Sequence, residues 1–168
     1  MAGDRDKTDR GRLPPIGFSP LRADDLRRVL EIERSCFSEP WSEDSFREVV
    51  AGGTFGSLAA RSAEGKLMGY IVYSEAADEL HILNVAVHRE FRRLGVASVM
   101  LKRIHQFGAD RGRAFSYLEV RESNRGAQEL YAKFGYKLLT KRKEYYSDNQ
   151  ENAILMVAPL NPKKKWRP

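Results

Sequence analysis

Residues 92–98 combine two arginines with small residues at the start of a predicted helix. The first amides of a helix have no internal partner, and the macrodipole places about half a positive charge at that end. Small side chains at Gly95, Ala97 and Ser98 would let oxygen atoms reach those amides, and the preceding arginines would add charge-assisted contacts. The stretch indicates a phosphate or pyrophosphate site, and by itself it leaves open a solvated, arginine-rich turn. The candidate site comprises Arg92, Arg93, Leu94, Gly95, Val96, Ala97 and Ser98.

Glu119 is a carboxylate inside the otherwise apolar predicted strand "FSYLEV". Side chains alternate along a strand, so Glu119 shares a face with Tyr117 and Arg121, whereas Leu118 and Val120 share the other. A carboxylate in such a strand costs free energy unless it is paired or functional. Glu119 is therefore a candidate general base, and an ion pair with Arg121 is the structural alternative.

Tyr131, in the predicted helix "NRGAQELYAKFG", is a candidate general acid. A phenol with a pKa near 10 is reasonably matched to a departing alkyl thiolate with a pKa of about 8.5 or somewhat above. The alternative is a tyrosine at the edge of the core with its hydroxyl at the surface. Asn124, or Ser123 before it, is a natural N-cap for the same helix.

Other catalytic chemistries lack support in the sequence. The three histidines (His81, His88 and His105) have no carboxylate or cysteine at metal-ligand spacing, so we expect no metal. The single cysteine, Cys36, excludes an internal disulfide and lies in no recognisable nucleophile motif. We interpret it as a partly buried helix residue.

Hydrophobic periodicity and turn residues predict the elements that must position these groups. Strands are expected at 16–22, 55–62, 66–76, 79–88, 115–120, 136–146 and 152–160, and helices at 23–37, 40–53, 95–110 and 124–135. Ser42 is the expected N-cap of the second helix, and Gly52 and Gly53 are its expected stop. The order β-α-α-β-β-β-α-β-α-β-β predicts an α/β (α+β) fold, with a mixed, mostly antiparallel central sheet and helices on both faces.

Length and charge place limits on the class of protein. The 168 residues fit one domain, which we assign to 16–160, with disordered segments at 1–15 and 161–168. Net charge is +6, but four positive charges lie in the tail "NPKKKWRP", so a broad nucleic-acid surface is poorly supported. The tail is interpreted as solubilising, with contact to an acidic or RNA-rich partner as the alternative. No apolar stretch approaches the ~18 residues that span a bilayer, and we expect a cytoplasmic protein that does not bind membranes and acts as a monomer.

The segment "NVAVHREFRRLGVASVMLKRI" resembles the acyl-coenzyme-A-binding motif of the GNAT superfamily of N-acetyltransferases. The signature R/Q-x-x-G-x-G/A matches residues 92–97, and the predicted element order agrees with the GNAT order over 16–160. Within the superfamily, "SCFSEPWSEDSF", "YLEVRESNRGAQELYAKFGY" and "EYYSDNQENAILMV" resemble the RimI-type ribosomal-protein-alanine N-acetyltransferases. The chain departs from that pattern at Ser147, where many relatives carry proline, and in its basic tail.

The resemblance implies acetyl-CoA as cosubstrate and direct transfer of its acetyl group in a ternary complex. It implies that Glu119 is the general base, Tyr131 the proton donor, and Asn124 a contact near the pantetheine. The backbone of Val85, Ala86 and Val87 would pair with the pantetheine amides like an added strand.

The resemblance also places the loops that contain Trp41, Tyr145 and Tyr146 beside a groove for a protein N-terminus. The preferred substrate would be the N-terminal alanine of a ribosomal protein. Alternatively, Trp41 only packs its loop and the two tyrosines only finish a strand. Glu39 or Glu43 would hold the charged group of the substrate, and the sequence does not distinguish them. The alternative functions are acetylation of a small-molecule amine or a lysine side chain, and acetyl-CoA binding without turnover.

Overall fold

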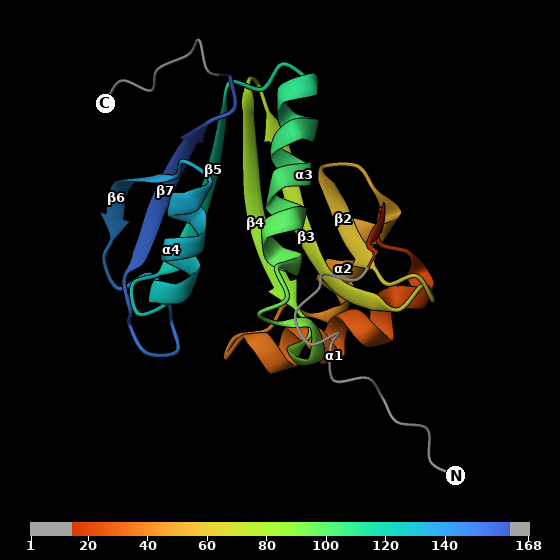
Figure 1. Ribbon diagram of the computed structural model, residues 1–168. Helices are drawn as coiled ribbons and strands as arrows, with labels where there is room; N and C mark the ends of the chain where they lie inside the picture. The colour runs from red at the N-terminus through yellow and green to blue at the C-terminus, as the bar shows by residue number, and fades with distance from the viewer. Residues whose placement is uncertain (1–14, 162–168) are drawn as a thin grey trace.

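The computed structural model describes residues 15–161, and these residues form a seven-stranded sheet with helices on both faces (Figure 1). Strand order is β1-β2-β3-β4-β5-β7-β6, and every neighbouring pair is antiparallel except β4 and β5. This confirms the predicted fold class. The predictions for the terminal segments concern residues that lie almost entirely outside the described range.

The first half of the chain supplies one helical layer and most of an antiparallel meander. Its strands are β1 (Gly17–Ser19), β2 (Phe55–Arg61), β3 (Leu67–Ala76) and β4 (Glu79–Val87), and its helices are α1 (Leu26–Cys36) and α2 (Glu43–Ala51). A short 3-10 turn, η2 (Ala23–Asp25), leads into α1. The hydroxyl of Ser42 accepts the amide of Ser45, which confirms the predicted N-cap, and Gly52 ends α2 with a φ of +80°.

The second half places two helices against the opposite face of the sheet. The elements are η3 (Arg89–Phe91), α3 (Val96–Asp110), β5 (Phe115–Arg121), α4 (Arg125–Lys133), β6 (Lys137–Arg142) and β7 (Ala153–Pro159). Strand β6 is shorter than predicted, because Glu144 adopts a φ of +51° and the chain turns there. Tyr145 and Tyr146 consequently lie in the β6–β7 loop and do not finish a strand.

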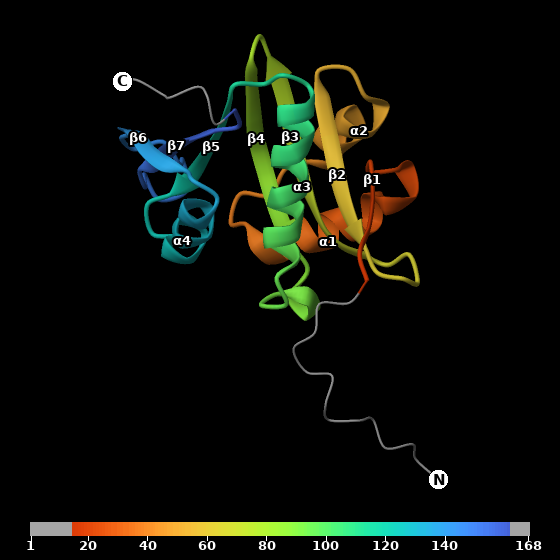
Figure 2. The same ribbon diagram turned by 45° about the horizontal axis from the view of Figure 1, so that its top comes forward.

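Two hydrophobic cores lie on the two faces of the sheet. One packs α3 and α4 against the sheet through residues such as Met100, Ile104 and Tyr131. The other packs α1 and α2 against the opposite face through Ile32 and Phe46. Figure 2 shows the same arrangement, with α3 lying along β3 and β4 and with α4 beside β5.

Strands β4 and β5, the one parallel pair in the described sheet, separate part of the way along their length. Strand β4 pairs with β5 over Glu79–Ile82, and β5 then continues its pairing with β7 as far as Arg121. A bulge at Leu83 shifts the register between β4 and β3, because Val72 pairs with Asn84 and Tyr73 pairs with Ile82. Beyond the bulge, the edge of β4 that faced β5 is open (Figure 1).

Candidate active site

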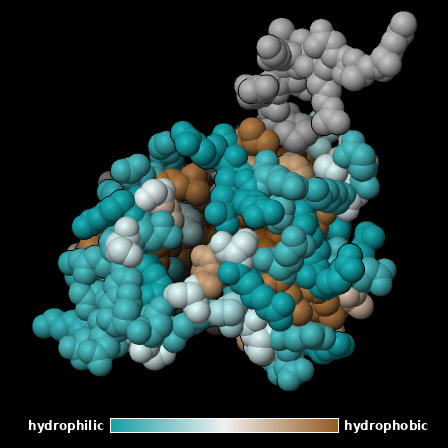
Figure 3. All heavy atoms as spheres, turned by 90° about the horizontal axis from the view of Figure 1, so that it is seen from below, coloured by the Kyte–Doolittle hydropathy of each residue, from teal (hydrophilic) through white to brown (hydrophobic). Residues whose placement is uncertain are grey.

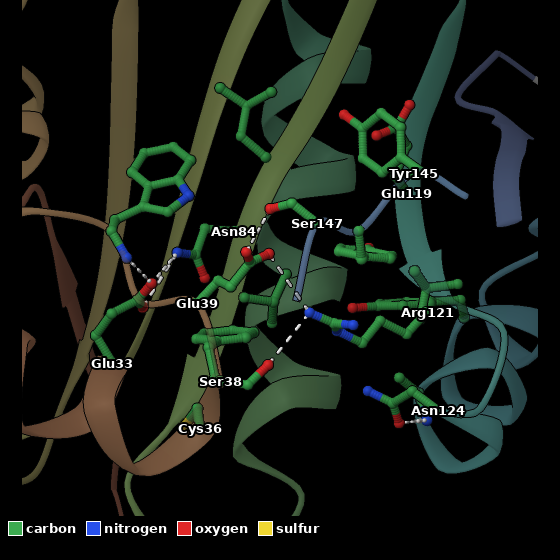
Figure 4. A pocket seen from close by; sticks show the side chains of 18 residues that line it. Glu33, Cys36, Ser38, Glu39, Asn84, Glu119, Arg121, Asn124, Tyr145 and Ser147 are labelled. Atoms are coloured by element: carbon green, nitrogen blue, oxygen red, sulfur yellow. Dashed lines mark hydrogen bonds and ion pairs between the residues drawn. The ribbon is translucent and has the colours of Figure 1, made fainter. Parts of the chain in front are cut away.

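A cleft of about 600 Å³ lies where β4 and β5 separate. Its walls come from α1 and the α1–α2 loop on one side, and from β5, α4 and the β6–β7 loop on the other (Figure 4). Seen from the lower end of Figure 1, hydrophobic residues appear within a hollowed and mostly hydrophilic surface (Figure 3). Seven of the predicted site residues line this cleft: Trp41, Val85, Glu119, Asn124, Tyr131, Tyr145 and Tyr146.

The open edge of β4 forms part of the cleft wall through Val85. The side chain of Ala86 is buried on the α1 side, whereas Val85 and Val87 pack toward the α3 side. The carbonyl oxygen of Val87 accepts a hydrogen bond from Nε of Arg92 at 3.0 Å. The other polar backbone groups beyond the bulge on this edge have no partner from β5, which leaves them accessible to an extended ligand.

The Arg92–Ser98 segment leads from β4 into α3, as expected from its sequence. Gly95 is the N-cap of α3 with a φ of +84°, and no side chain in the described part of the chain caps the first amides of the helix. Arg93 also has a positive φ, of 63°. A glycine suits the N-cap position, residue 95, because residues with an L side chain are strained in the left-handed region. At the start of α3, therefore, no described side chain accepts a hydrogen bond from the first backbone amides.

The two arginines of this segment differ in their contacts. The guanidinium of Arg92 donates to the carbonyl of Ser35 at 3.3 Å and lies 3.1 Å from Sγ of Cys36, in addition to its bond with Val87. It thereby ties the segment to α1 and β4. Arg93 is exposed and makes no hydrogen bond or ion pair with any other described residue.

Glu119 lies on β5, with Leu118 and Val120 buried on the opposite face as the alternation predicted. Its Oε1 pairs with Nη1 of Arg142 at 2.6 Å, and its side chain is 26% exposed. The structural alternative of a pair with Arg121 is wrong. Arg121 binds Asp148 at 2.9 Å and Glu151 at 3.3 Å, because its guanidinium reaches across to the β6–β7 loop.

Tyr131 lies on α4 and is 8% exposed, so it is not a surface tyrosine. Burial, with a smaller contribution from Tyr146, raises the pKa of Tyr131 to about 12. Its hydroxyl makes no hydrogen bond with any of residues 15–161. A phenol in this setting is fully protonated near neutral pH and keeps its proton available for a group in the cleft.

Asn124 is the N-cap of α4, because its Oδ1 accepts the amide of Ala127 at 3.1 Å. The capping prediction is confirmed. Asn124 also lines the cleft, so the cap and the predicted ligand contact are compatible.

The two loops at the rim of the cleft are joined to each other. Ser38 donates to Asp148 at 2.5 Å, and Ser147 donates to Glu39 at 2.6 Å. The guanidinium of Arg121 also stacks on the ring of Tyr146 at 3.8 Å. These contacts hold the α1–α2 loop against the β6–β7 loop.

The structure distinguishes the two acidic residues between which the sequence offered no choice. Glu39 lines the cleft, whereas Glu43 pairs with Arg47 on α2 and does not line it. The side chain of Trp41 contacts Phe46, with ring centroids 5.7 Å apart, and also borders the cleft. Trp41 thus packs its loop and lines the site as well.

Glu33 and Asn84 are cleft residues that sequence reasoning missed. Both are buried, at 1% and 7% exposure, and both line the cleft. A signal for Glu33 was present, because it follows Val29 by four positions and so falls on the apolar stripe of α1. Asn84 was an amide among the aliphatic residues of "ILNVAV".

A second hollow, of about 440 Å³, adjoins the cleft. The two share Trp41, Leu83, Glu119, Tyr145 and Tyr146, and the second extends along β4 and β5 to His81 and Tyr117. The rings of His81 and Tyr117 are stacked with centroids 5.3 Å apart. The cleft is thus continued on the far side of Glu119 by a surface rich in aromatic residues.

Comparison with known proteins identifies the family to which this fold and cleft belong. The family model for "Acetyltransferase (GNAT) family" matches residues 26–136. The chain therefore belongs to the GNAT family of acetyltransferases, which confirms the resemblance and the expectation of a transferase.

Individual proteins of known sequence or structure are also similar to this chain. A Bacillus subtilis protein, provisionally named a ribosomal protein bS18-alanine N-acetyltransferase, is 33% identical over 84% of this chain and 93% of its own length. The crystal structure of the Escherichia coli ribosomal-protein-S18-alanine N-acetyltransferase has a TM-score of 0.80 and 29% identity, covering 90% of this chain and all of that one. Arabidopsis thaliana NAA60, solved with acetyl-CoA, shares the fold at a TM-score of 0.77 and 20% identity, covering 86% and 98% of the two chains.

None of the helices within 15–161 is long and apolar enough to cross a membrane. In the same range, no cluster of three or more His, Cys, Asp or Glu residues is arranged to hold a metal ion.

Proposed function

We propose that this protein transfers the acetyl group of acetyl-CoA to the α-amine of a protein N-terminus. The observation that carries the proposal is the single cleft in which Glu119 and Tyr131 both lie, between the open edge of β4 and two joined aromatic loops. The cleft therefore provides a proton acceptor, a proton donor and walls suited to the end of a polypeptide.

Acetyl-CoA fits the elements on the α3 side of the sheet. Its pyrophosphate would bind the amides of Val96–Ser98, since an N-terminal helix end attracts anions and Arg93 has no competing partner among the described residues. Its pantetheine amides would pair with the open edge of β4 at Val85–Val87, and Asn124 would border that path. Leu94 and Gly95 shape the turn between these two parts.

The residues then supply direct transfer without an acyl-enzyme. The amine nitrogen attacks the thioester carbonyl, the C–S bond breaks, and an N-acetyl amide and a thiol are formed. Glu119 accepts a proton from the amine, directly or through a water. Tyr131 donates its proton to the departing sulfur, which its buried, protonated phenol can do.

An α-amine suits this base better than a lysine side chain. A protein α-amine with a pKa of about 7.7–8.0 is roughly one-fifth neutral near pH 7.3, whereas a lysine at about 10.4 is neutral roughly once in a thousand. The cleft is also bordered by Trp41, Tyr145 and Tyr146, which offer extended contact to the first residues of a polypeptide.

The proposed acceptor is the N-terminal alanine of a ribosomal protein, and the names of the relatives support it. A panel of peptides that differ only in the first residue tests this, with acetyl-CoA and mass spectrometry to locate the acetyl group. We expect α-amine acetylation, highest with alanine. Absence of α-amine acetylation across the panel, together with turnover of polyamines or lysine side chains, would favour the alternative acceptors.

A further inference from the structure

Glu33 is a buried carboxylate whose partners are all neutral. Its oxygens accept the backbone amide of Trp41 at 3.0 Å, the side-chain amide of Asn84 at 3.1 Å, and the hydroxyl of Tyr70. None of the Lys, Arg or His nitrogens in residues 15–161 lies within ion-pair distance of it. Burying a carboxyl group away from water is costly, so the position of Glu33 at the wall of a cleft calls for a functional explanation.

The carboxylate fixes the orientation of the Asn84 amide. Nδ2 of Asn84 lies 3.1 Å from both Glu33 oxygens, and only the N–H end of an amide can donate to a carboxylate. Oδ1 must therefore point away from Glu33, as Figure 4 shows. This oxygen is buried and has no hydrogen-bond partner among residues 15–161, and the Asn84 side chain, only 7% exposed, lines the cleft.

The bulge at Leu83 determines whether Oδ1 of Asn84 points to the α1 side of the sheet or to the α3 side, where acetyl-CoA is proposed to bind. Ala86, two residues after Asn84, packs on the α1 side of the sheet, whereas Val85 and Val87 pack on the α3 side. Asn84 consequently points toward α1 and the α1–α2 loop. The backbone amide of Trp41, in that loop, donates to the same Glu33 carboxylate. The amides proposed to hold the pyrophosphate lie at the start of α3, on the other side.

We propose that Oδ1 of Asn84 accepts a hydrogen bond from the α-amine of the acceptor, and that Glu33 is the residue that orients it. The proposal rests on the proposed function and adds a residue that touches the amine. Because Glu33 takes the N–H end of the Asn84 amide, the end that remains is an acceptor, which suits a cationic or strongly polar N–H donor. Asn84 binds the amine, and Glu33 acts through Asn84 as a positioning residue.

Two substitutions remove the bond by different routes. Asn84→Ala deletes the oxygen and leaves space for water to satisfy Glu33. Glu33→Gln is nearly isosteric and supplies an N–H, so the Asn84 amide is free to rotate and present its own N–H to the cleft. Tyr70→Phe is the matched control, because it also removes a donor to Glu33 but lies outside the cleft lining and leaves Asn84 oriented.

The measurements separate amine binding from cosubstrate binding and from folding. They are the KM and kcat for an alanine-starting peptide at saturating acetyl-CoA, calorimetric Kd values for acetyl-CoA and for the peptide in the presence of CoA, and Tm. For Asn84→Ala and Glu33→Gln we expect peptide KM and Kd to rise by about 10- to 100-fold, as for loss of a hydrogen bond to a charged group. We expect kcat and the acetyl-CoA Kd to stay within about threefold, and Tyr70→Phe to lower Tm without the rise in KM.

Other results would overturn the proposal. A weaker acetyl-CoA Kd with an unchanged peptide Kd would assign Oδ1 to a pantetheine amide. A fall in Tm alone, equal in all three variants, would make the cluster purely structural. Failure of the proposed function is distinct, because wild-type protein would then bind or acetylate no peptide, whatever the state of Asn84.

Discussion

Glu119 on β5 is ion-paired at 2.6 Å with Arg142 on the edge strand β6, which lies on the far side of β7. The same arginine lies 5.2 Å from the ring of Tyr145, and a hydrogen bond to Glu119 raises the pKa of the Tyr145 phenol. The proposed base is thus held from one side by groups of β6 and the β6–β7 loop. Its carboxylate still borders both hollows, so it remains accessible to an amine or to a water that relays its proton.

Glu119→Gln should lower kcat for an alanine-starting peptide by about 10²- to 10⁴-fold, because the amide cannot accept the proton. Steady-state kinetics with thiol detection measures the effect, and calorimetry should show an acetyl-CoA Kd close to that of the wild type. A variant that keeps more than about half of the wild-type kcat would exclude Glu119 as the base.

Tyr131→Phe should lower kcat on the order of 10²-fold, with little change in Tm, because the deleted hydroxyl makes no hydrogen bond with the described residues. Tyr136→Phe is its control. Tyr136 is also buried, but its hydroxyl bonds Ser116 at 2.6 Å and His105 at 2.9 Å, outside the cleft lining. That variant should lose about 1 kcal/mol of stability and keep its kcat. An unchanged kcat in Tyr131→Phe, with a reduced kcat in Tyr136→Phe, would argue against proton donation by Tyr131.

Gly95→Ala should weaken acetyl-CoA binding, because a side chain at φ +84° strains the start of α3 and approaches the proposed pyrophosphate. Gly135→Ala introduces the same strain, also at φ +84°, beyond the end of α4. Both variants should lose about 1–2 kcal/mol of stability. Only the first should raise the calorimetric Kd for acetyl-CoA, and an equal rise in both would show a general effect of strain.

Arg93→Met should affect acetyl-CoA binding alone, whereas Arg92→Met should also affect thermal stability. Arg93 has no partner within residues 15–161, so its loss should weaken acetyl-CoA binding and flatten the dependence of Kd on salt, with Tm preserved. Arg92 bonds Val87 and Ser35, so its loss should lower Tm as well. Calorimetry at two salt concentrations, with thermal melts, separates the two effects. A wild-type Kd in Arg93→Met would contradict the proposed anion contact.

Acid should weaken the β6–β7 loop through Glu151. Hydrogen bonds lower the pKa of Glu151 from 4.5 to about 2. Those from Ser123 contribute most, and those with Asn149 and Arg121 add to them. A depressed pKa stabilises the fold above pH 4.5, and that contribution is lost as pH falls toward 2. Wild-type Tm should therefore exceed that of Glu151→Gln at pH 6, and the difference should shrink between pH 4.5 and 2. A difference independent of pH would contradict this assignment.

The sequence by itself determined the order of the elements, the turn before α3 and the placement of Glu119 opposite a buried face. These features depend on local causes: periodicity of apolar residues, caps such as Ser42 and Asn124, and the left-handed backbone that Gly95 permits. It also indicated the family, because the R-x-x-G-x-A segment and the element order are local and sequential.

Only the tertiary structure decided which charged and polar groups meet. Glu119 pairs with Arg142 and not with Arg121, because β7 pairs with both β5 and β6 and holds these strands in a register that no local pattern encodes. The bulge at Leu83 turns Asn84 toward α1, where Glu33 holds it with its oxygen free. Such contacts depend on the packing of helices against a sheet, and a shift of one residue in register would send each of these side chains to the opposite face.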